Sequence, residues 1–250
     1  VLQDLSGNGY DGYITGSPRF DVNPAFNGSL NFSNTIDGDN YVNITSFNSV
    51  NFSEMSTGFT MAVSFDVSDD INTSTDVPLL TRNYGFGDEF AIRISGSGGD
   101  NGTMVSWIST TGENIDFFTN GVLDFTVPHR VYFVYNSSNN FTVYFDGIKN
   151  NSQVINTTNQ MMSNGGELLF GAFAAVTGDP GDVNFTGDIQ YFRMWNRSMT
   201  DAEVALMALN SLNNSQIHSA ATALTEQWRA SGYTYNSLGL FNSTAFNSSS

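Results

Sequence analysis

Apolar and polar residues alternate along much of the chain with a period of two. The clearest case is the segment 59–67, where alternate positions are apolar: Phe59, Met61, Val63, Phe65 and Val67. Successive residues of a strand point to opposite faces of a sheet, so this spacing predicts a strand that turns one face to a core.

A second alternating segment folds back on itself. Residues 131–135 (VYFVY) predict a buried strand, and 141–145 (FTVYF) predict its hairpin partner after a turn at Asn139-Asn140, with Asp146-Gly147 closing the pair. Further strands are expected at 12–15, 28–33, 40–45, 78–82, 89–95, 103–109, 115–119, 166–173 and 185–195. Many short strands between Gly-, Asn- and Asp-rich turns indicate an all-β fold, a two-sheet antiparallel jelly-roll β-sandwich.

Helical periodicity appears only near the C-terminus. Thr200 and Glu203 form a capping box ahead of a short helix. A second helical pattern covers 215–230, with apolar residues on one stripe and Gly232 as its stop. The sequence therefore predicts a jelly-roll domain over 1–210, and a C-terminal helix and extended tail over 211–250 that serves self-association or strand donation.

Asparagine followed two positions later by serine or threonine is unusually frequent. Ser and Thr make up about a fifth of the residues, so random placement of 30 asparagines gives about six such triplets, but the chain has 15. The triplet is the acceptor for N-glycosylation and marks a surface position in an exported protein. The candidate glycan sites are Asn27, Asn31, Asn43, Asn51, Asn72, Asn101, Asn136, Asn140, Asn150, Asn156, Asn184, Asn196, Asn213, Asn242 and Asn247.

Charge and composition narrow the possible partners. The formal net charge is -16, which argues against binding to nucleic acid or to an anionic membrane surface. No apolar run approaches 18 residues, so no membrane insertion is expected. With the glycan triplets, these features predict an extracellular or cell-surface protein whose signal peptide has been removed, and whose core is held without disulfides because it has no cysteine.

Several blocks, in order along the chain, resemble a laminin-G-like module of the concanavalin A-like lectin/glucanase superfamily. They are 4–12 (DLSGNGYDG), 28–32 (GSLNF), 40–44 (NYVNI), 58–63 (GFTMAV), 129–147 and 187–204. The resemblance implies a jelly roll and a role in adhesion or glycan recognition.

One element of that family pattern is missing here. Such modules usually begin with a strand before the Asp-x-Ser-Gly-Asn-Gly loop, whereas this chain starts three residues before Asp4. The vacant position would be an exposed sheet edge, filled either by the chain's own tail or by a neighbouring copy. The candidate donors are 224–232, which also fits the helical pattern, and the tail 233–247. Donation between subunits would build a homo-oligomer or polymer, such as a filament or coat.

An enzyme is not expected. The glucanase branch of the superfamily uses two carboxylates at i, i+2 or i, i+4 on one strand, and no Glu-x-Asp-x-Glu occurs. Asp37 and Asp39 have the first spacing, but their neighbours favour a turn. His129 and His218 are far apart in sequence, and His129 is expected to cap a strand or pack inside the sandwich.

Two loops are candidate ligand sites. Asp4, Asn8 and Asp11 surround a Gly-rich turn that can present several oxygens to Ca²⁺, with an Asx-turn that binds no metal as the alternative. Asp179 and Asp182 form a weaker candidate of the same kind. A glycan ligand would need an aromatic platform beside polar groups, for which the loop residues are Asn83, Tyr84, Phe86 and Asp88. A self-assembling structural glycoprotein and a calcium-dependent lectin-like adhesion module are therefore the two leading hypotheses, and a glycoside hydrolase is the third.

Overall fold

The structure is a computed structural model, and the chain divides into two compact units, Val1–Ala208 and Leu209–Ser250. The structure describes residues 1–4, 6, 8–21, 29–32, 40–50, 52, 55, 58–68, 77–82, 90–95, 103–110, 113–118, 124, 127–136, 138, 140–154, 166–172, 185–210, 229–235 and 241–247. For the strands within 103–118 and 229–247 only the backbone is described.

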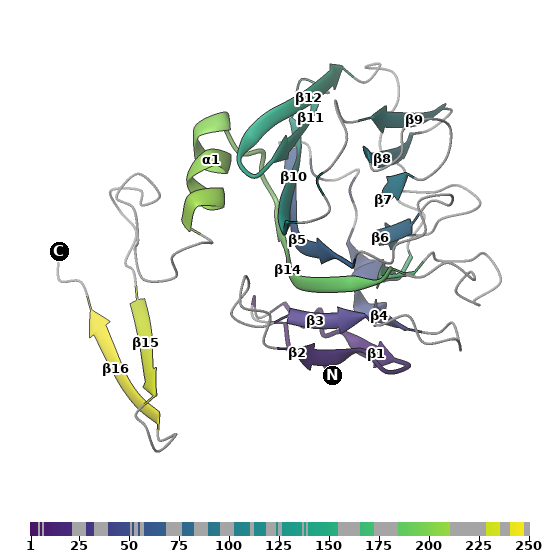
Figure 1. Ribbon diagram of the computed structural model, residues 1–250. Helices are drawn as coiled ribbons and strands as arrows, with labels where there is room; N and C mark the ends of the chain where they lie inside the picture. The colour runs from purple at the N-terminus through teal and green to yellow at the C-terminus, as the bar shows by residue number, and fades with distance from the viewer. Residues whose placement is uncertain are drawn as a thin grey trace. The chain divides into compact units, whose positions relative to one another are not determined.

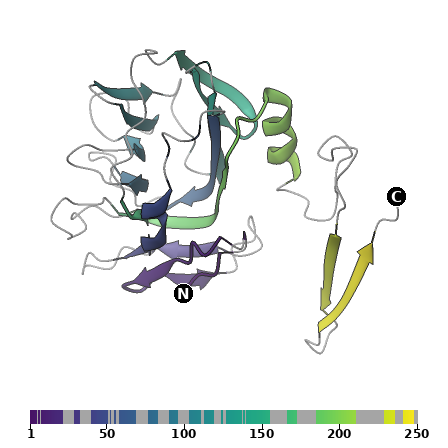
Figure 2. The same ribbon diagram turned by 180° about the vertical axis from the view of Figure 1, so that it is seen from behind.

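The first unit contains two antiparallel sheets of seven strands each, packed as two layers (Figures 1 and 2). The first sheet has the order β1 (Tyr13–Thr15), β4 (Tyr41–Ile44), β13 (Leu168–Phe170), β6 (Val77–Arg82), β7 (Phe90–Ser95), β8 (Thr103–Thr110) and β9 (Glu113–Phe118). The second has the order β12 (Ile148–Val154), β11 (Asn140–Phe145), β10 (His129–Asn136), β5 (Gly58–Val67), β14 (Gly187–Trp195), β3 (Ser29–Phe32) and β2 (Arg19–Asp21). This arrangement confirms the predicted jelly-roll sandwich.

Strand β5 is at the centre of the second sheet, and every one of its residues except Asp66 is buried. It pairs with β10 over eight residues, from His129 opposite Phe65 to Asn136 opposite Gly58. Its alternate residues, as predicted, enter the core between the sheets: Phe59, Met61, Val63, Phe65 and Val67. The core is therefore organised on the strand with the clearest alternation in the sequence.

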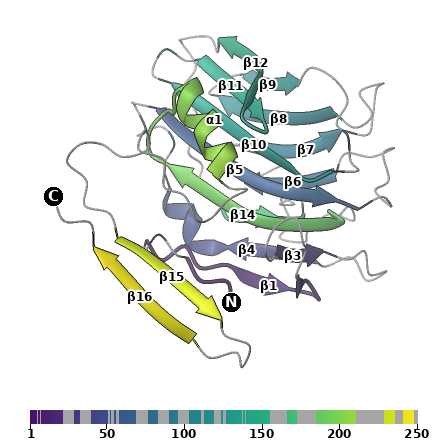
Figure 3. The same ribbon diagram turned by 60° about the vertical axis from the view of Figure 1, so that its left-hand side comes forward.

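Helix α1 (Asp201–Asn210) covers part of the outer face of the second sheet (Figures 1 and 3). Its buried residues Val204 and Ala208 pack with Tyr132 and Tyr144 of the sheet. The Tyr144 hydroxyl also donates a hydrogen bond to Asp201 Oδ1 at 2.7 Å. No helix in the described part of the chain is long and apolar enough to span a membrane.

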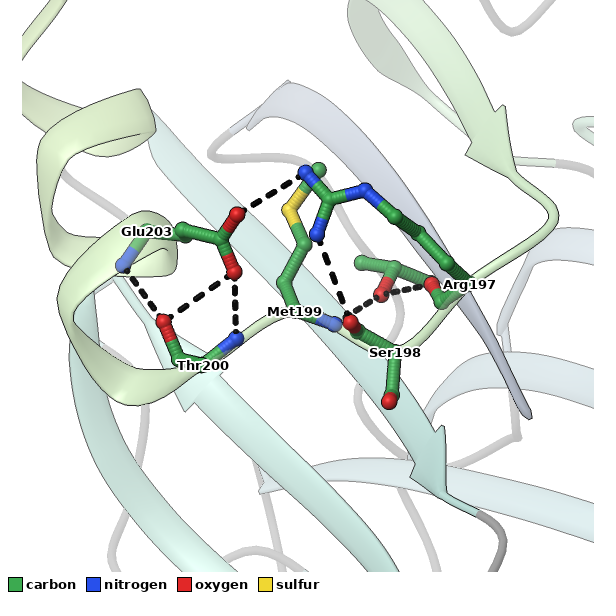
Figure 4. A network of polar contacts seen from close by, with 6 residues as sticks. Arg197, Ser198, Met199, Thr200 and Glu203 are labelled. Atoms are coloured by element: carbon green, nitrogen blue, oxygen red, sulfur yellow. Dashed lines mark hydrogen bonds and ion pairs between the residues drawn. The ribbon is translucent and has the colours of Figure 1, made fainter. Parts of the chain in front are cut away.

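The predicted capping box begins this helix (Figure 4). The Thr200 amide donates to Glu203 Oε2 at 2.8 Å, and the Glu203 amide donates to Thr200 Oγ1 at 3.3 Å. Arg197 Nη2 lies 2.9 Å from the second carboxylate oxygen of Glu203. The Met199 amide and the Arg197 carbonyl are both bonded to the Thr60 hydroxyl of β5, so the start of the helix is fixed to the central strand.

The predicted strands are present, with 166–173 shortened to Leu168–Phe170. Strands β2 and β12 and the 3-10 helix at Thr45–Ser49 were not predicted. The predicted turn at Asp146-Gly147 closes the β11–β12 hairpin, not the hairpin of β10 and β11, with both residues at positive φ, 50° and 85°.

The predicted C-terminal helix over 215–230 is wrong at its end. Arg229 and Ala230 begin β15 (Arg229–Tyr235), which pairs antiparallel with β16 (Phe241–Asn247), and the rest of that segment lies outside the described residues. Strands β15 and β16 are paired at seven residue positions. Pairing of this extent outweighs a local helical spacing of apolar residues. The tail expected to be extended therefore contains a hairpin in the second unit.

Gly58, at the start of β5, provides a direct test of the pairing register between β5 and β10. A Cβ on Gly58, at φ +93°, would lie 2.1 Å from the Tyr135 carbonyl oxygen of β10, whereas one on Gly9, at φ +79°, would meet nothing within 4 Å. We expect Gly9→Ala to lower the free energy of unfolding by about 1 kcal/mol through backbone strain alone. We expect Gly58→Ala to lower it by about 3 kcal/mol or more, because strand β10 must also move. Urea unfolding followed by fluorescence measures both, and equal losses would contradict the β5–β10 register.

Candidate functional site

The Asp4 loop is organised around one carboxylate. Asp4 Oδ1 accepts the Ser6 amide at 2.8 Å, and Oδ2 accepts the Ser6 hydroxyl at 2.8 Å and the amides of Asn8 and Tyr10 at 3.1 Å each. Asp11 Oδ1 accepts the Asp4 amide at 2.8 Å. Burial would raise the pKa of Asp4, but the hydrogen bonds from the loop hold it below its usual value. The carboxylate is thus ionised and both its oxygens are bound by the loop itself.

This geometry is the Asx-turn arrangement expected as the alternative to a metal site. The Asn8 side-chain amide donates to Ser6 Oγ at 2.9 Å, so it too is used within the loop. In the described segments no three His, Asp, Glu or Cys side chains are grouped so that they could hold a metal ion. Calcium at Asp4, Asn8 and Asp11 stays a prediction, and the second loop, Asp179 to Asp182, lies outside the described residues.

The predicted glycan-binding loop lies between two described strands. Strand β6 ends at Arg82 and β7 begins at Phe90, which fixes the ends of the loop in the first sheet. The predicted ligands Asn83, Tyr84, Phe86 and Asp88 are outside the described residues, as are Asp37 and Asp39.

His129 packs inside the sandwich, as predicted, and is 8% exposed. Its Nδ1 lies 3.0 Å from Asp146 Oδ2 and its Nε2 lies 2.8 Å from the Asp124 carbonyl oxygen. The ring also contacts Phe65 and Phe145. Burial would lower the pKa of His129, but the hydrogen bonds to Asp146 and Asp124 and their charges raise it above its usual value. Through its two nitrogens, the ring links the start of β10 to Asp146, directly after β11, and to Asp124.

The predicted glycan sites whose side chains are described are at least partly exposed. Six of them have described side chains and none is buried: Asn31, Asn43, Asn136, Asn140, Asn150 and Asn196. Asn40, a buried asparagine, is not in an acceptor triplet. Asn242 and Asn247 lie on β16, where only the backbone is described. The remaining predicted sites are outside the described residues: Asn27, Asn51, Asn72, Asn101, Asn156, Asn184 and Asn213.

Strand β14 is paired unequally on its two sides. It pairs with β5 from Gly187 to Trp195, but with β3 only from Gly187 to Ile189. Within the described strands, none pairs with 191–195 on the side away from β5. This half of β14 is partly accessible, unlike β5 and most of β10.

A cavity of about 1260 Å³ lies along this edge and reaches between the two sheets. We call this space, together with the edge 191–195, the β14 groove. Phe192 and Met194 of β14 line it, and Asp4 and Tyr10 of the loop described above line it too. Its other apolar lining residues include Leu2, Phe20, Leu30, Phe32, Val42, Ile44 and Phe47. The sequence suggested a vacant strand position, but not that β14 would border it.

The described strands form a two-sheet jelly roll with a large, mainly apolar groove, which places the chain in the jelly-roll class of β-sandwiches. The chain belongs to the Concanavalin A-like lectin/glucanases superfamily, because the family model for its laminin-G-type modules matches residues 36–205. Comparison with curated proteins finds no match.

Solved structures of toxin binding domains share the fold. The binding domain of Paraclostridial Mosquitocidal Protein 1 is 17% identical, with a TM-score of 0.66, covering 97% of this chain and 60% of that one. The binding domain of Botulinum neurotoxin DC, in complex with rat synaptotagmin II, is 14% identical with a TM-score of 0.61, covering 85% and 49%. The same domain in complex with SialylT is 14% identical, with a TM-score of 0.63, covering 85% of this chain and 49% of that one. This chain thus spans about half to three-fifths of those chains, and the likeness concerns the fold.

The His129–Asp146 pair predicts a pH dependence of stability. Because the pKa of His129 is higher in the folded chain than its ordinary 6.5, the protonated ring stabilises the fold, fully below that value and less as pH rises through the folded pKa. We expect the free energy of unfolding to fall between about pH 6 and pH 8 in the wild type, and to fall less in His129→Gln. Denaturation midpoints at each pH measure this, with His218→Gln as the control. An unchanged pH profile in His129→Gln would contradict the assignment.

Proposed function

We propose that the protein is an extracellular, N-glycosylated structural or adhesive module, without enzymatic activity, that self-associates into a filament or coat. Copies join when an extended segment of one copy adds as a strand in the β14 groove of the next. The half-paired edge of β14 beside an apolar groove is the observation that carries the proposal. The family's fold supports a binding or adhesive role.

The glycan coat is supported by the positions of the acceptor triplets. Asn196 is exposed just after β14, and Asn136 is the last residue of β10, directly before the turn to β11. There its side-chain oxygen accepts the amides of Ser138 and Asn140, which leaves its amide nitrogen outside those bonds. Asn43 differs, because its amide nitrogen donates to Glu167 and its oxygen is buried. The coat leaves a partner only those surfaces that the sugars do not cover.

The edge of β14 has the properties of a strand acceptor. An open strand edge offers backbone donors and acceptors to another chain, and pockets beside it select alternate side chains. Five residues span about 17 Å at the usual rise of a strand. Because Phe192 and Met194 point inward, a donor strand at this edge needs apolar side chains at alternate positions.

The donor we propose is residues 224–232 of a second copy, of which 229–232 already pair with β16 along one edge. On one face of that segment, taken as a strand, Leu224, Trp228 and Ala230 are apolar and Glu226 is charged. The segment contains no glycan triplet, whereas β16 carries Asn242 and Asn247, whose sugars would not fit an apolar groove. Copies with a net charge of -16 repel one another, so assembly strengthens as salt screens that charge.

The second candidate is a calcium-dependent lectin-like module. The neighbouring toxin structure in complex with SialylT supports it, as does the Asp4 loop at the groove. A glycan array read with and without a chelator distinguishes this function, since strand exchange requires neither glycan nor metal. The absence of catalysis is supported by His129, whose two ring nitrogens are both bound within the fold.

The glycan coat predicts site-specific occupancy in native material. We expect glycopeptide mass spectrometry to find Asn196 and Asn136 modified, since both lie at accessible positions beside turns. Asn43 should be modified least, because its amide nitrogen donates to Glu167 and its amide oxygen is buried. Occupancy of only one or two triplets in the whole chain would refute the proposed coat.

Strand exchange predicts that the tail controls assembly. We expect sedimentation and negative-stain microscopy to show salt-dependent fibres or sheets for the wild type. Trp228→Ser should weaken assembly about tenfold or more, because an aromatic anchor dominates such interfaces. Gln227→Ser, next to it on the opposite face of the segment, should assemble like the wild type.

Two outcomes would overturn the proposal. One is a wild type that stays monomeric at every salt concentration, and the other is Trp228→Ser and Gln227→Ser assembling equally well. Circular dichroism of each variant confirms that the sandwich is unchanged.

A further inference from the structure

Polar side chains gather on the outer face of the second sheet, beside helix α1 and away from the β14 groove's apolar lining. Arg130 of β10 and Tyr191 of β14 lie on either side of Ser64 of β5, in one row across the sheet. Tyr132 and Arg193 lie across β5 from each other in the next row. We call these five residues the outer arginine cluster.

Two atoms of this cluster, Ser64 Oγ and Arg130 Nε, are buried without a hydrogen-bond partner within the described residues. The Tyr132 hydroxyl is buried too, with Tyr191 as its polar neighbour. Ser64, Arg130 and Tyr132 are 0%, 7% and 1% exposed, respectively. An unpaired buried polar group costs about 1–3 kcal/mol, and two of them on adjacent strands indicate that something else binds there.

The cluster also contains two positive charges that lack an ion pair among the described residues. Arg193 stacks on the ring of Tyr191, with 4.6 Å from its Cζ to the ring centroid, which directs it along β14 toward the row of Ser64. Burial and then the neighbouring Tyr191 raise the pKa of Tyr132, while Arg130 and Arg193 both lower it. Both guanidinium groups are therefore close enough to act on the same tyrosine hydroxyl.

The nearest acidic groups have other hydrogen-bond partners. Asp146 accepts the Arg130 backbone amide at 2.8 Å and binds His129. Burial would raise the pKa of Asp146, but these hydrogen bonds and the charges of His129 and Arg130 lower it. Asp66 and Asp188 are opposite each other in the following row, and Asp188 accepts the Ser29 hydroxyl at 2.7 Å. In a chain with 24 acidic and 8 basic residues, two neighbouring arginines that form no ion pair with a described residue are unusual.

An irregularity in the backbone of β14 helps to bring Tyr191 and Arg193 to the outer face of the sheet. Its pairing with β5 has a register shift between Ile189 and Tyr191, after which Tyr191 comes opposite Ser64. Bulges of this kind re-aim side chains and are common beside binding sites. Without the shift, Tyr191 and Arg193 would point to the opposite face of the sheet.

We propose that the outer arginine cluster binds a small oxyanion, namely a carboxylate, sulfate or phosphate group. Arginine forks and hydroxyl donors are the groups that recognise such oxygens, because several donors can converge on one charge. The group belongs either to a free inorganic anion or to an acidic sugar. Tyr191 and Arg193 also belong to the edge 191–195 of the β14 groove, but anion binding on the outer face of the sheet does not require strand exchange.

Titration calorimetry tests the site with sodium sulfate, sodium phosphate and glucuronic acid as separate probes, at constant ionic strength set with chloride. We expect saturable binding of at least one probe by the wild type. Arg193→Gln should weaken it about tenfold, and Tyr132→Phe, which removes only the hydroxyl, should weaken it severalfold. Arg19→Gln, which removes the same charge from the exposed edge strand β2, should leave the affinity unchanged.

The choice of probe separates the two sources of the anion. Binding of sulfate or phosphate without glucuronic acid indicates a free anion, and the reverse indicates an acidic sugar. No saturable binding by a folded wild type means that the cluster holds ordered water only, which overturns the proposal. Equal weakening by Arg19→Gln also overturns it, because the effect would then come from general charge.

Discussion

The core, the start of helix α1 and the outer face of the second sheet all depend on the hydrogen-bonded pairing of β5 with β10 on one side and β14 on the other. The inward residues of β5 form the centre of the core, and its outward residue Thr60 holds the start of helix α1. The same pairing places Arg130, Ser64 and Tyr191 in one row, and it brings His129 to Asp146 through β10 and the turn after β11. A shift of this register by one residue would exchange the core face and the outer face together.

Strand β14 is the point where this order is incomplete. Its first half has neighbours on both sides, and its second half has a described neighbour only in β5. The cavity beside that half is mainly apolar because core residues of both sheets, such as Phe32 and Val42, line it. A glycan coat on the accessible asparagines would limit non-specific contacts at other surfaces while this edge remains available. In the proposed function, sugars and groove are therefore complementary, since one shields the surface and the other directs assembly.

Much of the fold follows from local sequence signals. The alternation at 59–67 predicted β5, and Thr200 with Glu203 predicted the helix start, because strand faces and capping boxes depend on residues close in sequence. Strand β12 (IKNNSQV) was missed because it is an accessible edge strand without apolar alternation. Arg229 and Ala230 were assigned to a helix because their strand partners, Asn247 and Phe246, lie far along the sequence, outside any local pattern. The outer arginine cluster joins residues from 64 to 193, and no local pattern encodes that register or its bulge.

The most direct test of the account is amide hydrogen exchange of β14 in assembled and dissociated protein. In assembled material, the amides of 191–195 that face away from β5 should exchange slowly, because a strand from a second copy accepts their hydrogen bonds. After dissociation at low salt these amides should exchange much faster, while those shared between β5 and β10 keep their protection. Equal exchange of 191–195 in the two states would contradict strand addition at this edge.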